Sequence, residues 1–442
     1  MEILKILQIQ IILKTLELFM GGIVIVELLQ RIKEALQLGN TGDQETGQQK
    51  DQTTDIEVND LTSEIIDTGC STYLVSAAAR ICVGRKPVEE YDKRIQHVNR
   101  VIGRGHESTL EHTNIIMMLH FNDKLLSSFT KLASSMFYLH WYIHQDSVTK
   151  EYHVLIGGSI RGYKNIFRDT KENSSNPIYE EIKMNLASSA ESVFFEDFFE
   201  DGIMNKNDFA FVDAETPEKN ICGNYVDFMQ GHKKFSEVFN QVHRYGFDEK
   251  EVMNVCTITV IFHDISRPIS MQIIRHRNGI SQESQRYVDY STKSFIDPMQ
   301  YTKDENKDKT YSVALFGINK SMKSKDLGNE LMQVYKQLTQ QGMLKQDARG
   351  FLPSNVCTKL MMTFTYSTFF HFLNMRQDKA AQPEIQAVAN EACDEFAIYD
   401  YDVAHSITCD KMKEFADKPE YYFLRKHEEE KISTLDEIIS EE

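Results

Sequence analysis

The 442-residue chain lacks most features of secreted, membrane-spanning and nucleic-acid-binding proteins. Its seven cysteines are scattered and form no Cys-x-x-Cys pair, which argues against a disulfide scaffold or a zinc site and for reduced thiols in a cytosol. No uninterrupted run of about 20 apolar residues is present, so we expect no membrane-spanning helix. The net charge of −17 argues against a general binder of nucleic acid or anionic membranes.

The two ends of the chain differ in composition from its middle. Polar residues such as Lys14 and Glu17 interrupt an apolar N-terminal stretch, which predicts an amphipathic helix. A Gln-, Asp- and Thr-rich segment follows and is typical of a flexible linker. We therefore assign residues 1–60 to a helix and linker, residues 61–420 to the main domain and residues 421–442 to a solvated acidic tail.

The most informative stretch is Arg275–Tyr287, which reads Arg-His-Arg-Asn-Gly-Ile-Ser-Gln-Glu-Ser-Gln-Arg-Tyr. The residues before it predict a helix that is capped by Ser266 and stopped by Gly279. Neighbouring helical residues point about 100° apart, so Arg275 and Arg277 are predicted to reach different anionic groups. A solvated basic helix end is the alternative, but the dense polar run favours a site for phosphate or uracil-like carbonyls.

Periodicity and turn residues predict the surrounding elements. We expect helices over residues 76–80, 88–102, 125–144, 180–201, 326–341, 371–376 and 384–399. We expect strands over residues 113–121, 152–156, 257–262 and 358–366. Residues 213–220 are predicted to form a linker.

The segment that begins at Gly105 reads Gly-His-Glu-Ser-Thr-Leu-Glu-His and contains two histidines. In a zincin helix the histidines are four residues apart with a glutamate between them. His106 and His112 are six apart and Glu111 adjoins the second, so we expect no metal site. A loop that places His106 against a ligand is the better interpretation.

Four segments in order resemble the signature of the flavin-dependent thymidylate synthases. They are the Arg-His-Arg segment that ends in Ser-x-Arg-Tyr, and residues 105–112, 348–353 and 372–385. The resemblance implies an α+β fold with a mixed or antiparallel sheet and flanking helices, assembled as a homotetramer with FAD at subunit contacts. Residues 124–255 then form a long, mostly helical insertion in the catalytic domain.

The resemblance also implies a reaction, the conversion of dUMP to dTMP with methylenetetrahydrofolate and NADPH as co-substrates. Arg376 would lie against the uracil ring, where a fixed cation favours charge building on the pyrimidine. His106 would stand where folate and flavin exchange the one-carbon unit. Ser284 would donate or accept a hydrogen bond in the dUMP pocket, since the sequence offers no evident base to make it a nucleophile.

Binding residues follow from the same resemblance. FAD would contact Ser108, Arg275, His276, Arg277, Gln282 and His371. The dUMP pocket would be lined by Gln272, Arg275, Ser284, Gln285, Arg286, Arg349 and Arg376. Of these, Arg286 and Arg349 would hold the phosphate.

The sequence departs from the family pattern where the family carries a flavin-binding Asn-x-Arg. Thr365 and Ser367 stand there instead. We hypothesise that Arg161 and Asn165, which have similar spacing within the insertion, make this flavin contact. The signature run is also one residue shorter than usual, so the loop after Arg277 is expected to differ.

Three functional hypotheses remain open at this point. The first is an active flavin-dependent thymidylate synthase. The second is a non-catalytic relative that binds flavin or nucleotide as a regulatory or interaction module, as the insertion and the shortened loop suggest. The third is an unrelated phosphate- or nucleic-acid-binding protein, which the acidic charge and the four ordered motifs disfavour.

Overall fold

The computed structural model describes residues 61–168, 175–195, 221–222, 224–229, 232–277, 279–301, 308–315, 317–400 and 403. The predicted N-terminal helix and linker, the linker at 213–220 and the acidic tail lie outside these residues. Within them, no helix combines the length and the apolar character needed to span a bilayer.

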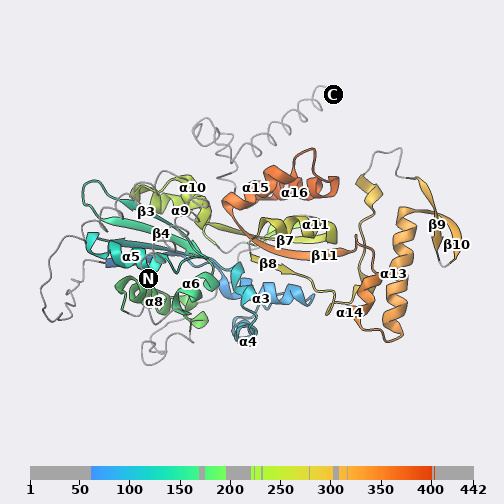
Figure 1. The fold of residues 1–442 in the computed structure, drawn as a ribbon, viewed down its shortest axis with the longest axis horizontal. Coiled ribbons are helices and arrows are strands. Elements are labelled where there is room, and N and C mark those ends of the chain that lie inside the picture. Colours follow the sequence, from blue (N-terminus) through green and yellow to red (C-terminus); the bar gives the residue numbers. More distant parts are fainter. Residues whose placement is uncertain are drawn as a thin grey trace, which may run out of the picture. The chain divides into compact units, whose positions relative to one another are not determined.

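A five-stranded antiparallel sheet carries the signature stretch (Figure 1). In spatial order its strands are β5 (Ile221–Cys222), β6 (Val226–Met229), β7 (Thr257–Ser266), β11 (Cys357–Thr365) and β8 (Gly279–Gln282). Side chains alternate along β11: Leu360, Met362 and Phe364 enter one core and Met361 enters another. The predicted strands at 257–262 and 358–366 are confirmed.

Helices cover both faces of this sheet (Figure 1). One face packs against α9 (Phe235–Val242), α10 (Glu249–Val255), α11 (Arg267–Ile273), α15 (Tyr366–Arg376) and α16 (Pro383–Tyr399). The other face packs against α3 (Ser71–Cys82), which presents the fully buried Ala77 and Ala78 and the nearly buried Leu74. These small side chains let α3 lie close to the strands, as the sequence predicts.

A second, four-stranded antiparallel sheet joins residues from before and inside the predicted insertion. Its strands, in spatial order, are β1 (Leu61–Asp67), β2 (Ile115–Phe121), β4 (Tyr152–Gly158) and β3 (His140–Gln145). One face is covered by α5 (Leu126–Ala133), α6 (Ile160–Arg168) and α8 (Pro177–Ala187). The segment 124–255 has more helix than strand, but β3 and β4 make it integral to a sheet.

Several predicted boundaries are wrong. The helix expected over 125–144 ends at Ala133, because the aromatic, β-branched run of β3 pairs with β4 instead. The helix expected from residue 88 begins at Tyr91 as α4 (Tyr91–Ile102). The helix expected over 180–201 is α8, which ends at Ala187 and is followed by a separate 3₁₀ turn.

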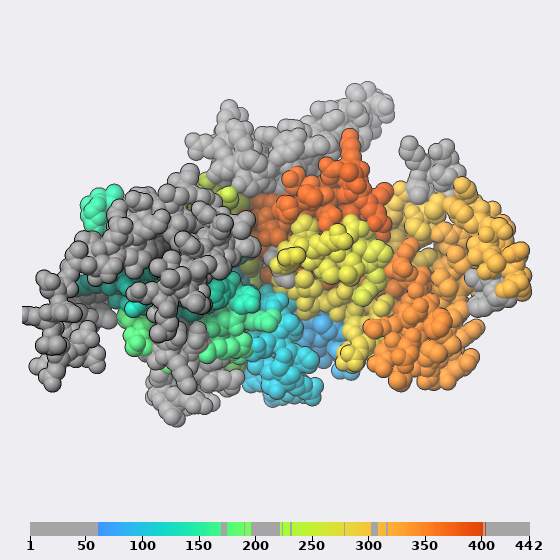
Figure 2. Space-filling model, in the orientation of Figure 1, coloured from blue at the N-terminus to red at the C-terminus, as the bar shows by residue number. Residues whose placement is uncertain are grey.

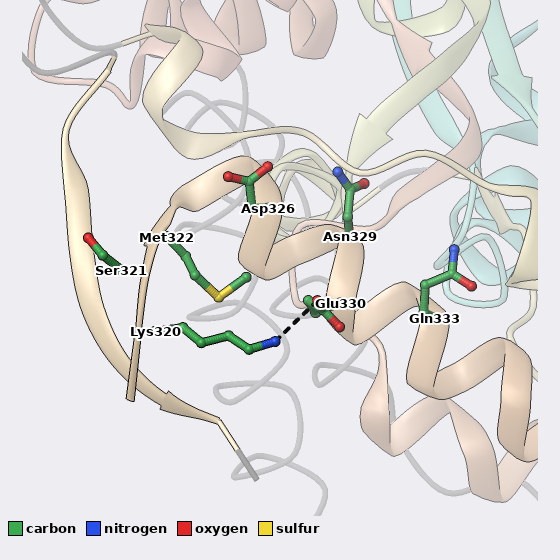
Figure 3. Close-up of a pocket in the computed structure, with 7 residues that line it drawn as sticks. All are labelled: Lys320, Ser321, Met322, Asp326, Asn329, Glu330 and Gln333. Atoms are coloured by element: carbon green, nitrogen blue, oxygen red, sulfur yellow. Dashed lines mark ion pairs between the residues drawn. The ribbon is translucent and has the colours of Figure 1, made fainter. Parts of the chain in front are cut away.

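The segment between β8 and β11 forms a hairpin and two helices. It contains β9 (Thr310–Leu315), β10 (Ile318–Lys323), α13 (Ser324–Gln340) and α14 (Lys345–Ala348). An open depression of about 640 Å³ lies between β10 and α13, with Lys320 and Glu330 facing each other across it (Figure 3). None of the residues predicted for flavin or nucleotide binding lines it.

Candidate active site

The path of the chain through the signature stretch is set by α11 and the turn that follows it. Ser266 is the N-cap residue of α11 as predicted, but its side chain makes no capping hydrogen bond, because its hydroxyl donates to Glu384. The 3₁₀ turn η6 (Ile274–His276) extends the helix. Arg277 adopts a left-handed φ of 53° and ends the turn, so the predicted stop at Gly279 is wrong. Gly279 instead begins β8, where a Cβ atom would lie 2.5 Å from the Glu111 carbonyl oxygen.

The structure brings one group of predicted residues together at the C-terminal ends of α11 and α15. We call it the α11–α15 cluster: Gln272, Arg275, His276, His371 and Arg376. The Arg376 guanidinium donates through Nη2 to the Gln272 carbonyl oxygen at 3.2 Å. Figure 2 shows the yellow surface that includes α11 against the orange-red surface of α15 and α16.

Burial and neighbouring cations disfavour the charged forms of Arg376 and His276. Burial, and then the neighbouring Arg275, lower the pKa of Arg376. Burial lowers the pKa of His276 to about 4, and Arg376 and His371 add to the effect. The rings of His276 and His371 are 5.6 Å apart between centroids. His276 is therefore neutral at pH 7. The guanidinium groups of Arg275 and Arg376 lie close together, so the cluster is arranged to attract an anion.

Two nitrogens of the cluster are buried with no hydrogen-bond partner among the described residues. They are Nε2 of His276 and Nε of Arg376. An unsatisfied buried polar atom costs about 1–3 kcal/mol, so such atoms need a reason. A polar ligand bound between α11 and α15 would supply their missing partners.

Glutamine side chains tie α11 to its neighbours. Gln272 donates through Nε2 to Gln382 Oε1 at 3.0 Å. Gln282, on β8, donates through Nε2 to Ser270 Oγ of α11 at 2.6 Å. Gln282, predicted to contact flavin, therefore lies against the helix that carries the cluster.

The loop after β8 carries the remaining signature residues. The Ser284 backbone N–H donates to the Cys82 carbonyl oxygen at the end of α3, at 3.0 Å. Its hydroxyl accepts the Arg286 backbone N–H at 3.2 Å. Arg286 is exposed and its guanidinium lies 5.5 Å from the centroid of the Tyr287 ring, while Gln285 is half-buried.

Arg349 lies on a different element from the other predicted arginines. Arg349 begins the exposed 3₁₀ turn η9 (Arg349–Phe351). Among the described residues, the Arg349 side chain forms no ion pair or hydrogen bond. Two guanidinium groups that hold one phosphate form no bond with each other, so the predicted phosphate-binding pair, Arg286 and Arg349, stays a prediction.

The Gly-His segment packs directly against the signature strand. It forms the 3₁₀ helix η1 (Glu107–His112), with His106 and Ser108 exposed and His112 fully buried. His112 lies 3.0 Å from both Thr363 Oγ1 on β11 and Ser281 Oγ on β8. Burial lowers its pKa to about 3, so it is a neutral link between elements. Sequence reasoning missed this role, because the family-like segment does not reveal which histidine faces inward.

The hypothesised flavin contact from the insertion lies beside η1. Arg161 forms an ion pair with Glu111, and Asn165 Oδ1 accepts a hydrogen bond from Arg168 Nη1 at 3.0 Å. Where the family carries Asn-x-Arg, Thr365 caps α15, and the buried hydroxyl of Ser367 has no hydrogen-bond partner among the described residues. No three His, Cys, Asp or Glu side chains in the described residues are arranged to hold a metal ion.

Comparison with known proteins supports the resemblance. Residues 213–398 match the family model described as thymidylate synthase complementing protein. The flavin-dependent thymidylate synthase of Clostridium tetani is 31% identical over 170 residues, 37% of this chain and 66% of that protein. Those of Pyrococcus furiosus and Pyrococcus abyssi are 29% and 27% identical over 157 residues.

These two matches cover 34% of this chain and 59% of each archaeal protein, so the chain spans somewhat over half the length of the relatives that it matches. The matched region holds the α11–α15 cluster, the signature loop and η9, whereas η1 precedes it. The part of the chain that carries the cluster thus matches the thymidylate synthase complementing protein family and is similar to flavin-dependent thymidylate synthases.

Proposed function

We propose that this protein is a flavin-dependent thymidylate synthase that methylates dUMP reductively to dTMP. The observation that carries the proposal is the α11–α15 cluster, in which Arg275, His276 and Arg376 converge and two buried nitrogens lack partners. Groups of this kind fit an anionic, planar ligand better than an apolar one. The family match over the same residues supports this choice of ligand.

The residues present fit a flavin at this place. His276 and His371 offer aromatic edges and ring nitrogens, and Gln282 and Arg277 offer hydrogen-bond donors on the adjoining strand and turn. Arg275 supplies a positive charge beside them. When bound, FAD would supply the hydride that the reductive methylation requires. Ser108 on η1, with Arg161 and Asn165 on α6, would also contact the flavin.

The chain's own residues would bind and polarise the nucleotide. Arg376, held by the Gln272 carbonyl, would face the pyrimidine and favour negative charge on its ring oxygens and N3, which makes C5 more nucleophilic. Ser284 and Gln285 would donate and accept hydrogen bonds at the nucleotide. Arg286 and Arg349 would hold the phosphate, with His106 near the folate.

The exposure of Arg286 and Arg349 is consistent with a site completed by another copy of the chain. A homotetramer, as the family resemblance implies, would place exposed Arg286 and Arg349 opposite a neighbour's cluster. Methylenetetrahydrofolate and NADPH would be the co-substrates, in a cytosolic setting. These features are part of the proposal.

The experiment is to purify the full chain, record its flavin absorbance and measure tritium release from 5-labelled dUMP with methylenetetrahydrofolate and NADPH. We expect a yellow protein whose tritium release depends on both co-substrates. A yellow protein without tritium release would favour the alternative, a flavin- or nucleotide-binding relative that acts as an interaction module. A colourless protein that takes up no added FAD would refute the flavin site.

A further inference from the structure

A buried carboxylate that no predicted role uses joins α16 to the start of α11. Glu384, the second residue of α16, is 5% exposed. Its Oε1 accepts the Ser266 backbone N–H at 2.9 Å and its Oε2 accepts the Ser266 hydroxyl at 2.8 Å. Ser266 is 1% exposed and makes no side-chain cap of its own helix, so both of its donors serve the carboxylate.

The same short segment of chain holds α11 at two further points. Gln382 accepts the hydrogen bond from Gln272, and Arg376 donates to the Gln272 carbonyl oxygen. Of these three attachments, the one at Ser266 is the most buried. Glu384 accepts two hydrogen bonds at this most buried point, so it supplies the firmest of the three attachments.

The length of α11 makes its starting point matter. A seven-residue helix is about 10 Å long, so a tilt of about 5° at Ser266 moves its far end by roughly 1 Å. A misplacement of about 1 Å can cost a reaction about 10²-fold in rate. Gln272, Arg275 and His276 all lie at or beyond that far end.

We propose that Glu384 is a positioning residue: its carboxylate fixes the start of α11 against α16, so that Gln272, Arg275 and His276 face Arg376. The carboxylate touches no residue predicted to bind substrate or flavin, and acts through Ser266. The part of this inference that is tested by turnover rests on the proposed function.

The test compares three variants of the full chain. Glu384→Ala removes both acceptors. Glu384→Gln keeps the geometry, because an amide oxygen accepts the backbone N–H while its NH₂ donates to the Ser266 hydroxyl. Glu391→Ala is the matched control: Glu391 also lies on α16 and accepts two backbone N–H groups, those of Tyr225 and Val226, but on β6 and its approach.

We expect Glu384→Ala to lower kcat/KM for dUMP at least tenfold and to speed amide hydrogen exchange over residues 267–277 at least tenfold. Glu384→Gln should stay within threefold of the wild type in both measurements. Glu391→Ala should lower the Tm. At a temperature where this variant is folded, its kcat/KM and its exchange rates over residues 267–277 should stay within threefold of the wild type. If Glu384→Ala does not fold, Ser266→Ala removes one of the two hydrogen bonds and should give a smaller increase in the same exchange rates.

Wild-type exchange and kcat/KM in Glu384→Ala would overturn the inference. So would a Glu384→Gln variant as impaired as Glu384→Ala, since that result would assign the effect to charge and not to position. If the wild type shows no turnover, the proposed function fails on its own. The exchange measurements on the same variants still decide whether Glu384 holds α11.

Discussion

His112 lies 3.0 Å from Ser281, and this contact joins two segments of the chain that are 169 residues apart. The second ring nitrogen lies 3.0 Å from Thr363, whose hydroxyl is 2.8 Å from that of Thr259. One neutral imidazole thus connects η1, β8, β11 and β7 on the face of the sheet opposite α11. The position of the Gly-His segment against the signature strand depends on it.

The burial of His112 predicts a pH dependence of stability. Its pKa is about 3 in the folded state and near 6.5 when unfolded, so the unfolded chain binds more protons between these values. The contribution of neutral His112 to the free energy of unfolding is fully present above about pH 6.5. It falls as the pH drops towards 3, by up to roughly 1.4 kcal/mol per pH unit. Urea unfolding at pH 7.5 and pH 5 measures the change.

His112→Gln is the matched variant for that measurement. It keeps a hydrogen-bonding side chain but cannot titrate, so the difference in unfolding free energy between the two pH values should shrink by about 1–2 kcal/mol. An unchanged difference would show that His112 is not the group responsible.

Gly279 should be intolerant of a side chain. A Cβ atom there would lie 2.5 Å from the Glu111 carbonyl oxygen, so Gly279→Ala must push η1 away from β8. We expect a loss of about 1–3 kcal/mol in the free energy of unfolding. Gly350→Ala is the control, because nothing lies within 4 Å of its Cβ position, and thermal unfolding of both variants tests the contrast.

Arg376→Ala should separate flavin binding from turnover. We expect the variant to retain bound FAD, because Arg275, His276 and Gln282 remain, and to lose about 10²-fold or more in kcat, because the cation facing the pyrimidine is gone. Flavin absorbance and tritium release measure the two effects. Turnover at the wild-type rate would refute the role given to Arg376.

Arg161→Ala tests whether the insertion supplies the missing flavin contact. The ion pair between Arg161 and Glu111 is half-exposed, so its loss alone should cost about 1 kcal/mol or less in stability. If Arg161 also contacts FAD, the Kd for FAD should rise about tenfold, as fluorescence quenching would report. Lys131→Ala, which removes an exposed cation on α5, is the control. Unchanged FAD retention would refute the hypothesis that Arg161 replaces the family's Asn-x-Arg contact.

Local patterns in the sequence determined much of the scaffold. The apolar run of β11, the small residues of α3 and the helix that begins at Pro383 follow from local composition and end signals, which act over a few residues. The ordered motifs likewise indicated Arg275, His276 and Arg376, which the fold brings close together.

Long-range packing decided the rest. The run from His140 to Gln145 became a strand because β4 offered a partner, and Gly279 is glycine because the η1 backbone passes within contact distance. His112 is buried against β8, and Glu384 accepts hydrogen bonds from Ser266, 118 residues away. No local pattern in the sequence predicts these contacts. Which side chains fill a core or face a ligand depends on elements distant in sequence, so only the tertiary structure could show it.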